Sequence, residues 1–214
     1  MSLQSNALQT TVAKLLYPVI PQARQRPGER IRMTVRPVRM FGDPVLVTPA
    51  EEVTDFDRQV RRLVKDLTQT LRDEDGAGLS APQIGVGLRV FVFDVGDVRG
   101  HLINPVLDFP DEAEEDGLEG CLSFPGLYYD VKRRLNVVAS GFDADGRPVR
   151  VVGDHNLARC LQHETDHLDG ILFIDRMDAP TRKQAMRAIR KADWAGLDIP
   201  AVKVSPHPLH GLIR

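Results

Sequence analysis

The sequence predicts an α+β fold, with antiparallel sheets packed around a central helix and a further helix toward the C-terminus. Several β-branched segments follow one another without helices between them, which disfavours a parallel sheet. Asp145-Gly146 separates two of these segments and is a signal for a tight antiparallel hairpin. Helix-like segments follow the strands. This order favours sheets around a helix over repeated βαβ units.

Two long helices are predicted from their apolar spacing and their end signals. The first follows Thr54 and Asp57, which form an N-cap pair. Its apolar residues recur every three or four positions: Phe56, Val60, Leu63, Val64, Leu67 and Leu71. The second, central helix covers about residues 154–168, with Asp154 as its N-cap and Gly170 as its stop.

Four strands are predicted from β-branched and aromatic residues: Leu88–Val95, Leu102–Leu107, Asn136–Phe142 and Arg147–Val152. The segment Asp111–Glu119 carries six carboxylates. We expect it to be a solvated loop between strands, because charge runs of this kind are usually solvated, with Glu119 as the exception. His101 and His155 have no predicted partner and are expected at the surface or at a cap.

The 214 residues suffice for one well-buried core. We expect a poorly anchored N-terminal extension over residues 1–32, a catalytic domain over 33–195 and a C-terminal tail over 196–214. A net charge of −2 argues against specific DNA binding, and no apolar stretch is long enough to span a membrane. The prolines around residues 15–20 argue against a secretory signal, so a cytoplasmic location is expected.

The segment Gln162-His-Glu-Thr-Asp-His167 predicts a metal site. His163 and His167 are four residues apart, so on a helix both imidazoles face the same side and can reach one ion. Glu164 lies beside the first ligand and can reach a water in the ion's open position, as a general base requires. Cys121 is the obvious third ligand, because a thiolate completes a catalytic three-ligand set.

Cys160, the second of the two cysteines, lies three residues before His163 and is predicted to be a small buried residue lining the site. A disulfide between Cys121 and Cys160 is the alternative, which a cytosolic chain would not keep oxidised. Two structural histidines on a half-buried helix are the alternative for His163 and His167.

Three segments in this order resemble the peptide deformylase family: Gly76-Ala-Gly-Leu-Ser-Ala-Pro-Gln83, Glu119-Gly-Cys-Leu-Ser123 and the His163–His167 segment. The resemblance spans about residues 34–195. The first segment departs once, with Ser80 where the family usually has alanine, a change not expected to matter. The family removes the formyl group from the N-terminal formyl-methionine of new bacterial proteins.

The resemblance implies roles for further residues. Gln83, through its side-chain amide, and Leu122, through its backbone N–H, would stabilise the substrate oxyanion. Gly78 and Gly120 would pair with the main chain of the substrate like an added strand. The resemblance also implies that Asp166 pairs with Arg133 rather than with the metal. The family usually holds Fe²⁺, with zinc, nickel and cobalt forms known, and the ligand set does not decide among them.

The methionine side chain of such a substrate needs an apolar pocket, for which we consider Ala77, Tyr128, Cys160 and the His163 ring. Arg159, one turn before His163, is an unusual neighbour for that pocket, and the sequence leaves its orientation open. The main rival function is a zinc-dependent peptidase of the H-E-x-x-H type, which normally takes Glu, Asp or His as third ligand. A non-catalytic metal-binding module is a second rival, although it would not need Glu164.

A last helix is predicted over about Thr181–Trp194, with Ala185, Met186 and Ile189 on one face. Residues 181–192 carry five positive charges and no acid: Arg182, Lys183, Arg187, Arg190 and Lys191. A solvated helix face is one interpretation. The other is contact with ribosomal RNA, because the substrates would be N-formyl-methionyl nascent peptides and some family members use a basic C-terminal helix in this way.

Overall fold

The computed structural model describes residues 35–195. The N-terminal extension predicted over residues 1–32 and the tail predicted over 196–214 lie outside the described residues, so both boundaries stay predictions. Within the described range, no helix is long and apolar enough to cross a membrane.

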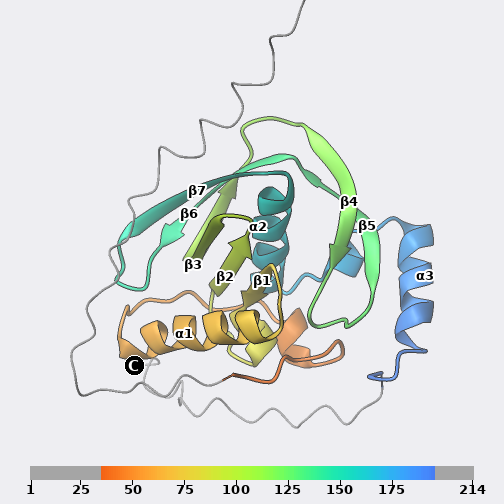
Figure 1. Cartoon of the computed structure of the whole chain (residues 1–214), viewed down its shortest axis with the longest axis horizontal. Helices are drawn as coiled ribbons and strands as arrows, with labels where there is room; N and C mark the ends of the chain where they lie inside the picture. The colour runs from red at the N-terminus through yellow and green to blue at the C-terminus, as the bar shows by residue number, and fades with distance from the viewer. Residues whose placement is uncertain (1–34, 196–214) are drawn as a thin grey trace, which may run out of the picture. The chain divides into compact units, whose positions relative to one another are not determined.

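Between residues 35 and 195, two antiparallel sheets and three α-helices make up the fold, which confirms the predicted α+β class (Figure 1). The larger sheet has the strand order β1-β2-β3-β6-β7. Its strands are β1 (Gly78–Ser80), β2 (Val90–Val95), β3 (Val98–Asp108), β6 (Asn136–Phe142) and β7 (Pro148–Asp154). The smaller sheet pairs β4 (Glu114–Gly120) with β5 (Tyr128–Arg134). The helices are α1 (Arg58–Asp73), α2 (His155–Leu168) and α3 (Ala179–Ile189).

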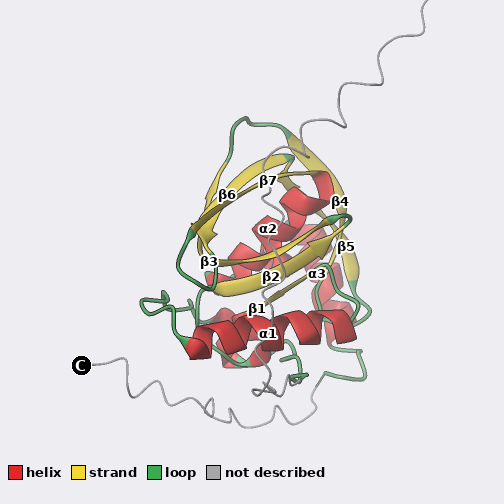
Figure 2. Cartoon of the chain, turned by 60° about the vertical axis from the view of Figure 1, so that its left-hand side comes forward, coloured by secondary structure: helices red, strands yellow, loops and turns green. Residues whose placement is uncertain are grey.

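The five-stranded sheet is covered on both faces, and β2 shows why its sequence is continuously apolar. Successive side chains of a strand point to opposite faces. Phe91 and Phe93 pack in a cluster with α2, whereas Val90 and Val92 pack in a cluster with α1. Figure 2 shows α1 running along one side of these strands and α2 on the other. Helix α2 is therefore enclosed by protein, as predicted for the central helix.

The predicted helix ends agree with the structure except at Thr54, which does not cap α1 and donates instead to Asp55 Oδ2 at 3.3 Å. Asp57 caps α1, because its carboxylate accepts hydrogen bonds from the N–H groups of Gln59 and Val60 at 2.7 and 3.1 Å. Asp154 occupies the N-cap of α2, although its side chain makes no capping bond. Gly170 follows α2 with φ of +71°, a conformation that favours glycine and stops the helix.

The prediction of a solvated loop over residues 111–119 was wrong, because most of it forms β4. Every residue of β4 has a partner on β5, and three of its four acidic residues lie across from basic ones: Glu114 from Arg134, Glu115 from Arg133, and Asp116 from Lys132. Opposite charges across two strands stabilise a pair whose composition alone disfavours a sheet. β1 and β5 were also missed by the sequence analysis.

The last helix is shorter than predicted at its C-terminal end. α3 ends at Ile189, and Arg190 is its C-cap, so Lys191 follows the helix. Asp178 caps its other end by accepting from the Thr181 N–H at 2.7 Å. Ala185 and Ile189 are buried and Met186 packs partly against the same cluster, as predicted for the face that holds the helix.

Candidate metal centre

Helix α2 supplies two of the candidate ligands. His163 and His167 are both buried, and their ring centroids lie 4.9 Å apart, one turn apart along the helix. The third candidate, Cys121, directly follows β4, and its Sγ lies 3.2 Å from His167 Nε2. Ligand atoms of these three residues lie within 4.8 Å of one another. The structure therefore brings together the cluster that the sequence predicted.

The hydrogen bonding around the histidines fits a metal ion. His163 Nδ1 donates to Glu119 Oε1 at 2.7 Å, because an ionised carboxylate can only accept, and Nε2 is thereby left as the ligand atom. Burial lowers the pKa of His163, but contacts with Cys121 and Glu119 outweigh it and raise the pKa well above its usual value. Burial and His163 lower the pKa of His167, which keeps that ring neutral. His167 thus has the neutral ring that a divalent ion binds, whereas an ion at this cluster would displace the proton from His163 Nε2.

Glu164 is in an environment suited to proton transfer. Its side chain is 3% exposed, and its Oε2 is buried with no hydrogen-bond partner among the described residues. Burial raises the pKa of Glu164 to about 7, although the nearby His163 acts in the opposite direction. A carboxyl group that titrates near neutral pH can both take up and release a proton under those conditions.

A buried ion-pair network lies beside the candidate ligands and contacts His163 through Glu119. Arg133 donates to both oxygens of Glu119 at 2.9 and 2.7 Å and to Asp166 Oδ2 at 2.6 Å. This contact confirms the Asp166–Arg133 pair implied by the resemblance. Arg176 also binds Asp166, at 2.5 and 3.0 Å. Hydrogen bonds from Arg133 and His163 outweigh the effect of burial and hold the pKa of Glu119 far below its usual range.

Arg159, whose orientation the sequence left open, points into the small sheet. Its guanidinium donates to Glu119 Oε2 at 3.2 Å, to the Val131 carbonyl at 2.6 Å and to the Glu115 carbonyl at 3.1 Å. It thus joins α2 to both β4 and β5, and Glu119 is the shared acceptor of Arg133, Arg159 and His163. Nothing in the sequence predicts this shared role, apart from the place of Glu119 at the start of the Glu119–Ser123 segment.

Gln83 lies beside the cluster, in the short helix η2 (Ala81–Ile84) that follows β1. Its Nε2 lies 3.5 Å from Cys121 Sγ and 3.2 Å from Ser123 Oγ. Leu122, the other residue implied to stabilise an oxyanion, directly follows Cys121. The three sequence segments therefore meet at one place.

Gly78 has no room for a side chain. A Cβ placed there would lie 2.8 Å from Cys160 Sγ and still closer to the Glu164 carboxylate. The Cys160 thiol is itself buried and donates to the Ala77 carbonyl at 3.4 Å. Burial and the charge of Glu164 raise the pKa of Cys160, so it stays a protonated thiol, in line with its prediction as a lining residue.

Tyr128 occupies a different place from the one expected. Its ring lies against Gly120, where a Cβ would come within 2.6 Å of it. The side chain is nevertheless 62% exposed, so Tyr128 borders the site at the surface and does not line an enclosed apolar pocket. Ala77 is likewise exposed.

The two remaining described histidines have partners that sequence analysis did not find. The Ala144 N–H donates to His101 Nε2 at 3.0 Å, and burial lowers the pKa of His101. His155, the first residue of α2, contacts Glu115 Oε2 through Nδ1 at 2.5 Å. Neither belongs to the metal-ligand cluster.

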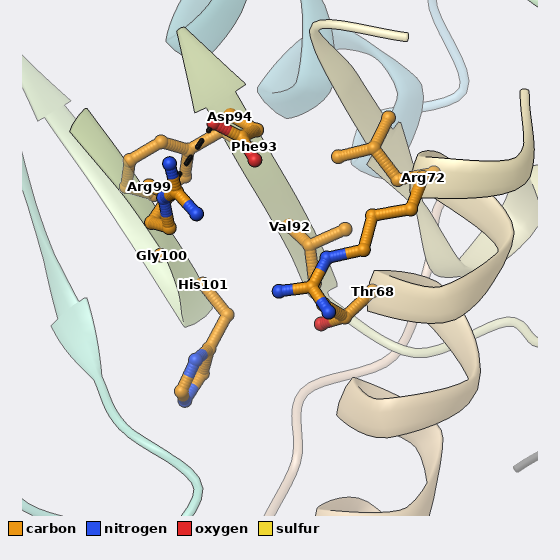
Figure 3. A pocket seen from close by; sticks show the side chains of 9 residues that line it. Thr68, Arg72, Val92, Phe93, Asp94, Arg99, Gly100 and His101 are labelled. Atoms are coloured by element: carbon orange, nitrogen blue, oxygen red, sulfur yellow. Dashed lines mark ion pairs between the residues drawn. The ribbon is translucent and has the colours of Figure 1, made fainter. Parts of the chain in front are cut away.

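A separate pocket lies between α1 and the hairpin of β2 and β3 (Figure 3). Thr68 and Arg72 line it from α1, and His101 lines it from β3. Arg99 of β3 pairs with Asp94 of β2 on the strand side of the pocket, at 3.8 Å. None of its lining residues belongs to the metal-ligand cluster, so this pocket is separate from the candidate metal centre.

A Cys-His-His cluster beside a buried carboxylate, in a fold of this kind, is typical of one class of protein, the metal-dependent hydrolases. Comparison with known proteins narrows this class. The family model described as polypeptide deformylase matches residues 35–183. A peptide deformylase of Acidothermus cellulolyticus is 62% identical over 179 residues, which cover 84% of this chain and 98% of the relative. One of Parafrankia is 58% identical over 180 residues, with the same two coverages.

The solved structures that match this chain are also peptide deformylases. The peptide deformylase of Thermus thermophilus matches with a TM-score of 0.69 and 40% identity, over 73% of this chain and 94% of that one. The Ehrlichia chaffeensis peptide deformylase in complex with actinonin matches with a TM-score of 0.71 and 31% identity, over 76% and 99%.

This chain therefore belongs to the polypeptide deformylase family. It is an enzyme that hydrolyses the formyl group from the N-terminal formyl-methionine of newly made polypeptides and releases formate. The rival interpretation as a zinc-dependent peptidase is not favoured, since the matches are deformylases and the third candidate ligand is a cysteine.

Proposed function

We propose that Cys121, His163 and His167 bind one divalent ion and that Glu164 moves the proton during deformylation. The observation that carries this proposal is the convergence of three ligand atoms within 4.8 Å of one another beside a buried carboxyl group. When bound, the ion supplies Lewis-acid activation of water and of the formyl carbonyl. The chain supplies the remaining parts of the reaction.

Glu164 accepts the proton of the attacking water and passes it to the amine that leaves. Its pKa, which burial raises to about 7, suits both directions of this transfer. The position of Gly78 against the Glu164 carboxylate lets a substrate backbone come close to the base without a side chain between them.

Gln83 and Leu122 stabilise the negative charge that develops on the formyl oxygen. The donor atom Gln83 Nε2 already lies beside the proposed ligand, 3.5 Å from Cys121 Sγ. The Leu122 N–H follows the same ligand in the chain. Donors that are in place before the reaction stabilise the transition state without reorganising during it.

The substrate main chain pairs with Gly78 and Gly120, which lie at the ends of β1 and β4. Ala77 and Tyr128, both exposed beside these glycines, contact the substrate at the surface. The methionine side chain packs near Cys160 and the His163 ring. Formyl is the smallest acyl group, so restricted space beside the base excludes larger acyl groups.

The direct test of the activity is formate release from formyl-Met-Ala-Ser by the metal-loaded protein. A long unformylated peptide serves as the comparison substrate, with cleavage followed by mass spectrometry. We expect formate from the first and no cleavage of the second. Cleavage of the long peptide without formate release would instead support the peptidase alternative.

We propose that the ion in cells is Fe²⁺, with Zn²⁺, Ni²⁺ and Co²⁺ able to occupy the same thiolate and imidazole ligands. Protein prepared without oxygen should then carry iron and lose activity on exposure to air, while nickel-loaded protein keeps it. Elemental analysis before and after exposure measures the difference. Iron-free protein from an anaerobic preparation that is fully active would contradict this assignment.

We propose further that the enzyme works in the cytoplasm at the ribosome, through the basic residues of α3 and its C-cap. Lys183, Arg187 and Arg190 are exposed, whereas Arg182 is paired with Asp175 at 3.2 Å. Ala185 and Ile189 anchor the opposite face in the core. The basic face is thus held outward, where phosphates of ribosomal RNA attract it over a Debye length of about 8 Å at physiological salt.

The test reverses Arg187, Arg190 and Lys191 to Glu. A matched control reverses Lys65, Arg72 and Arg150, which are exposed on other elements, with the same change in net charge. We expect the first variant to lose salt-sensitive cosedimentation with ribosomes and the control to keep it, with activity on a free formyl-peptide unchanged in both. Equal cosedimentation of both variants would leave α3 as a solvated helix.

A further inference from the structure

We propose that the Ser80 hydroxyl is a positioning group that holds the carboxamide of Gln83 in its reactive orientation. The inference rests on the proposed role of Gln83 in stabilising the oxyanion. It concerns the one residue at which the first motif of this chain departs from the family's usual alanine. From the sequence alone, this serine is not expected to matter.

Both the backbone and the side chain of Ser80 bind the same atom of Gln83. The Ser80 N–H donates to Gln83 Oε1 at 2.9 Å, and the Ser80 hydroxyl donates to it at 3.0 Å. Ser80 is 0% exposed and Gln83 is 1% exposed, so bulk water does not compete for these bonds. An amide oxygen has two lone pairs, and this pair of donors occupies both.

The backbone around this contact is held on both sides. Ser80 is the last residue of β1 and pairs with Phe91 of β2. Gln83 is held by η2, and its own carbonyl accepts the Arg39 N–H at 2.7 Å. The carboxamide therefore reaches toward the metal-ligand cluster from a fixed base, and only its side-chain torsions remain to be set.

The hydroxyl affects which end of the amide faces the site. With Oε1 bound by Ser80, Nε2 points to Cys121 Sγ and Ser123 Oγ. The reversed amide would place its oxygen against the Cys121 thiolate and its nitrogen against the Ser80 N–H. Both contacts are unfavourable, because the first brings two acceptors together and the second two donors. Donation to Oε1 also polarises the amide and strengthens Nε2 as a donor, because linked hydrogen bonds reinforce one another.

An alanine at position 80 would keep the backbone bond and lose the hydroxyl bond. We expect Ser80→Ala to lower kcat about fivefold, the usual effect of one neutral hydrogen bond, with KM and metal content unchanged. Gln83→Leu should lower kcat by roughly 10²-fold. In the Gln83→Leu background, Ser80→Ala should have no further effect, because the two residues act as one unit.

This double-mutant cycle of Ser80→Ala and Gln83→Leu can overturn the proposal in two ways. Wild-type kcat in Ser80→Ala, or an equal loss from Ser80→Ala with and without Gln83, would overturn the proposal, the latter by showing that Ser80 acts on the scaffold and not on the amide. Ser80→Thr, which restores a hydroxyl, should recover most of the loss.

A second measurement does not depend on activity. In zinc-loaded, ¹⁵N-labelled protein the side-chain NH₂ signals of Gln83 can be assigned by their absence in Gln83→Leu. Ser80→Ala should shift these signals and speed their exchange with water, whereas unchanged signals would refute the proposal. If the wild type released no formate but these signals responded to Ser80→Ala, the deformylase assignment would fail while the positioning contact stood.

Discussion

Glu164 differs from an ordinary helix glutamate in two ways: it is buried from solvent, and no group in the described part of the chain hydrogen-bonds to its Oε2. Glu164→Gln keeps the shape of the side chain and removes the proton acceptor. We expect the metal content to stay at that of the wild type and kcat to fall by at least about 10²-fold, measured by elemental analysis and formate release. Glu74→Gln, at the exposed C-terminal end of α1, is the matched control and should change neither quantity. Near wild-type kcat in Glu164→Gln would mean that Glu164 is not the base.

Variants of the two cysteines can distinguish a metal ligand from a residue that only lines the site. Cys121 Sγ lies 3.2 Å from His167 Nε2, whereas the Cys160 thiol is buried and bonded to a carbonyl. Cys121→Ala should therefore lose the metal, and Cys160→Ala should retain about one ion per chain, by elemental analysis after dialysis. One ion per chain in Cys121→Ala would remove that residue from the ligand set.

The close approach of β1 to α2 is a property of these two elements and depends on Gly78. A Cβ at this position would meet Cys160 Sγ at 2.8 Å and the Glu164 carboxylate, and neither can retreat easily because both are buried. Gly78→Ala should lower kcat/KM by about 10²-fold with the metal retained, because it displaces the base and obstructs the substrate.

Gly87→Ala is the control for this change, since a Cβ there meets nothing within 4 Å. It should leave kcat/KM at the wild-type value. Full activity in Gly78→Ala would mean that β1 and α2 can separate without cost and that the substrate does not lie along Gly78.

The ion-pair network around Glu119 joins β4, β5, α2 and Arg176, which follows η3 (Phe173–Asp175). Glu119→Gln removes one buried charge and leaves Arg133 and Arg159 without their shared counter-charge. We expect the free energy of unfolding at pH 7 to fall by about 3 kcal/mol, as for other buried pairs that lose one partner. Urea unfolding of the wild type and the variant at several pH values measures this difference.

The pH dependence of that difference follows from the direction of the pKa shift. The pKa of Glu119 is lower in the folded protein than its unfolded value of about 4.3. Its stabilising contribution is therefore complete above about pH 5 and declines as the pH falls below about 4.3 toward the folded pKa. A gap between wild type and Glu119→Gln that grew on acidification would contradict the network's role.

Local patterns in the sequence were enough for much of this molecule. The spacing of apolar residues and the Asp57 cap predicted α1, and the four predicted strands correspond to β2, β3, β6 and β7. The His163–His167 segment predicted the ligand face of α2, because helical geometry alone places residues four apart on one side. Cys121 was predicted as the third ligand. All of these depend on contacts between residues close in sequence or on a recognised segment.

Other features could be decided only by the tertiary structure. The acidic strand β4 is stable because β5 provides a basic partner strand, and no property of residues 114–120 alone predicts it. The orientation of Arg159 depends on carbonyls at Glu115 and Val131, both more than 25 positions away in the chain. The exposure of Tyr128 and the hydroxyl bond of Ser80 likewise depend on which groups the fold brings near. Sequence determines local conformation through short-range sterics and spacing, whereas burial and long-range hydrogen bonds exist only once the elements have packed.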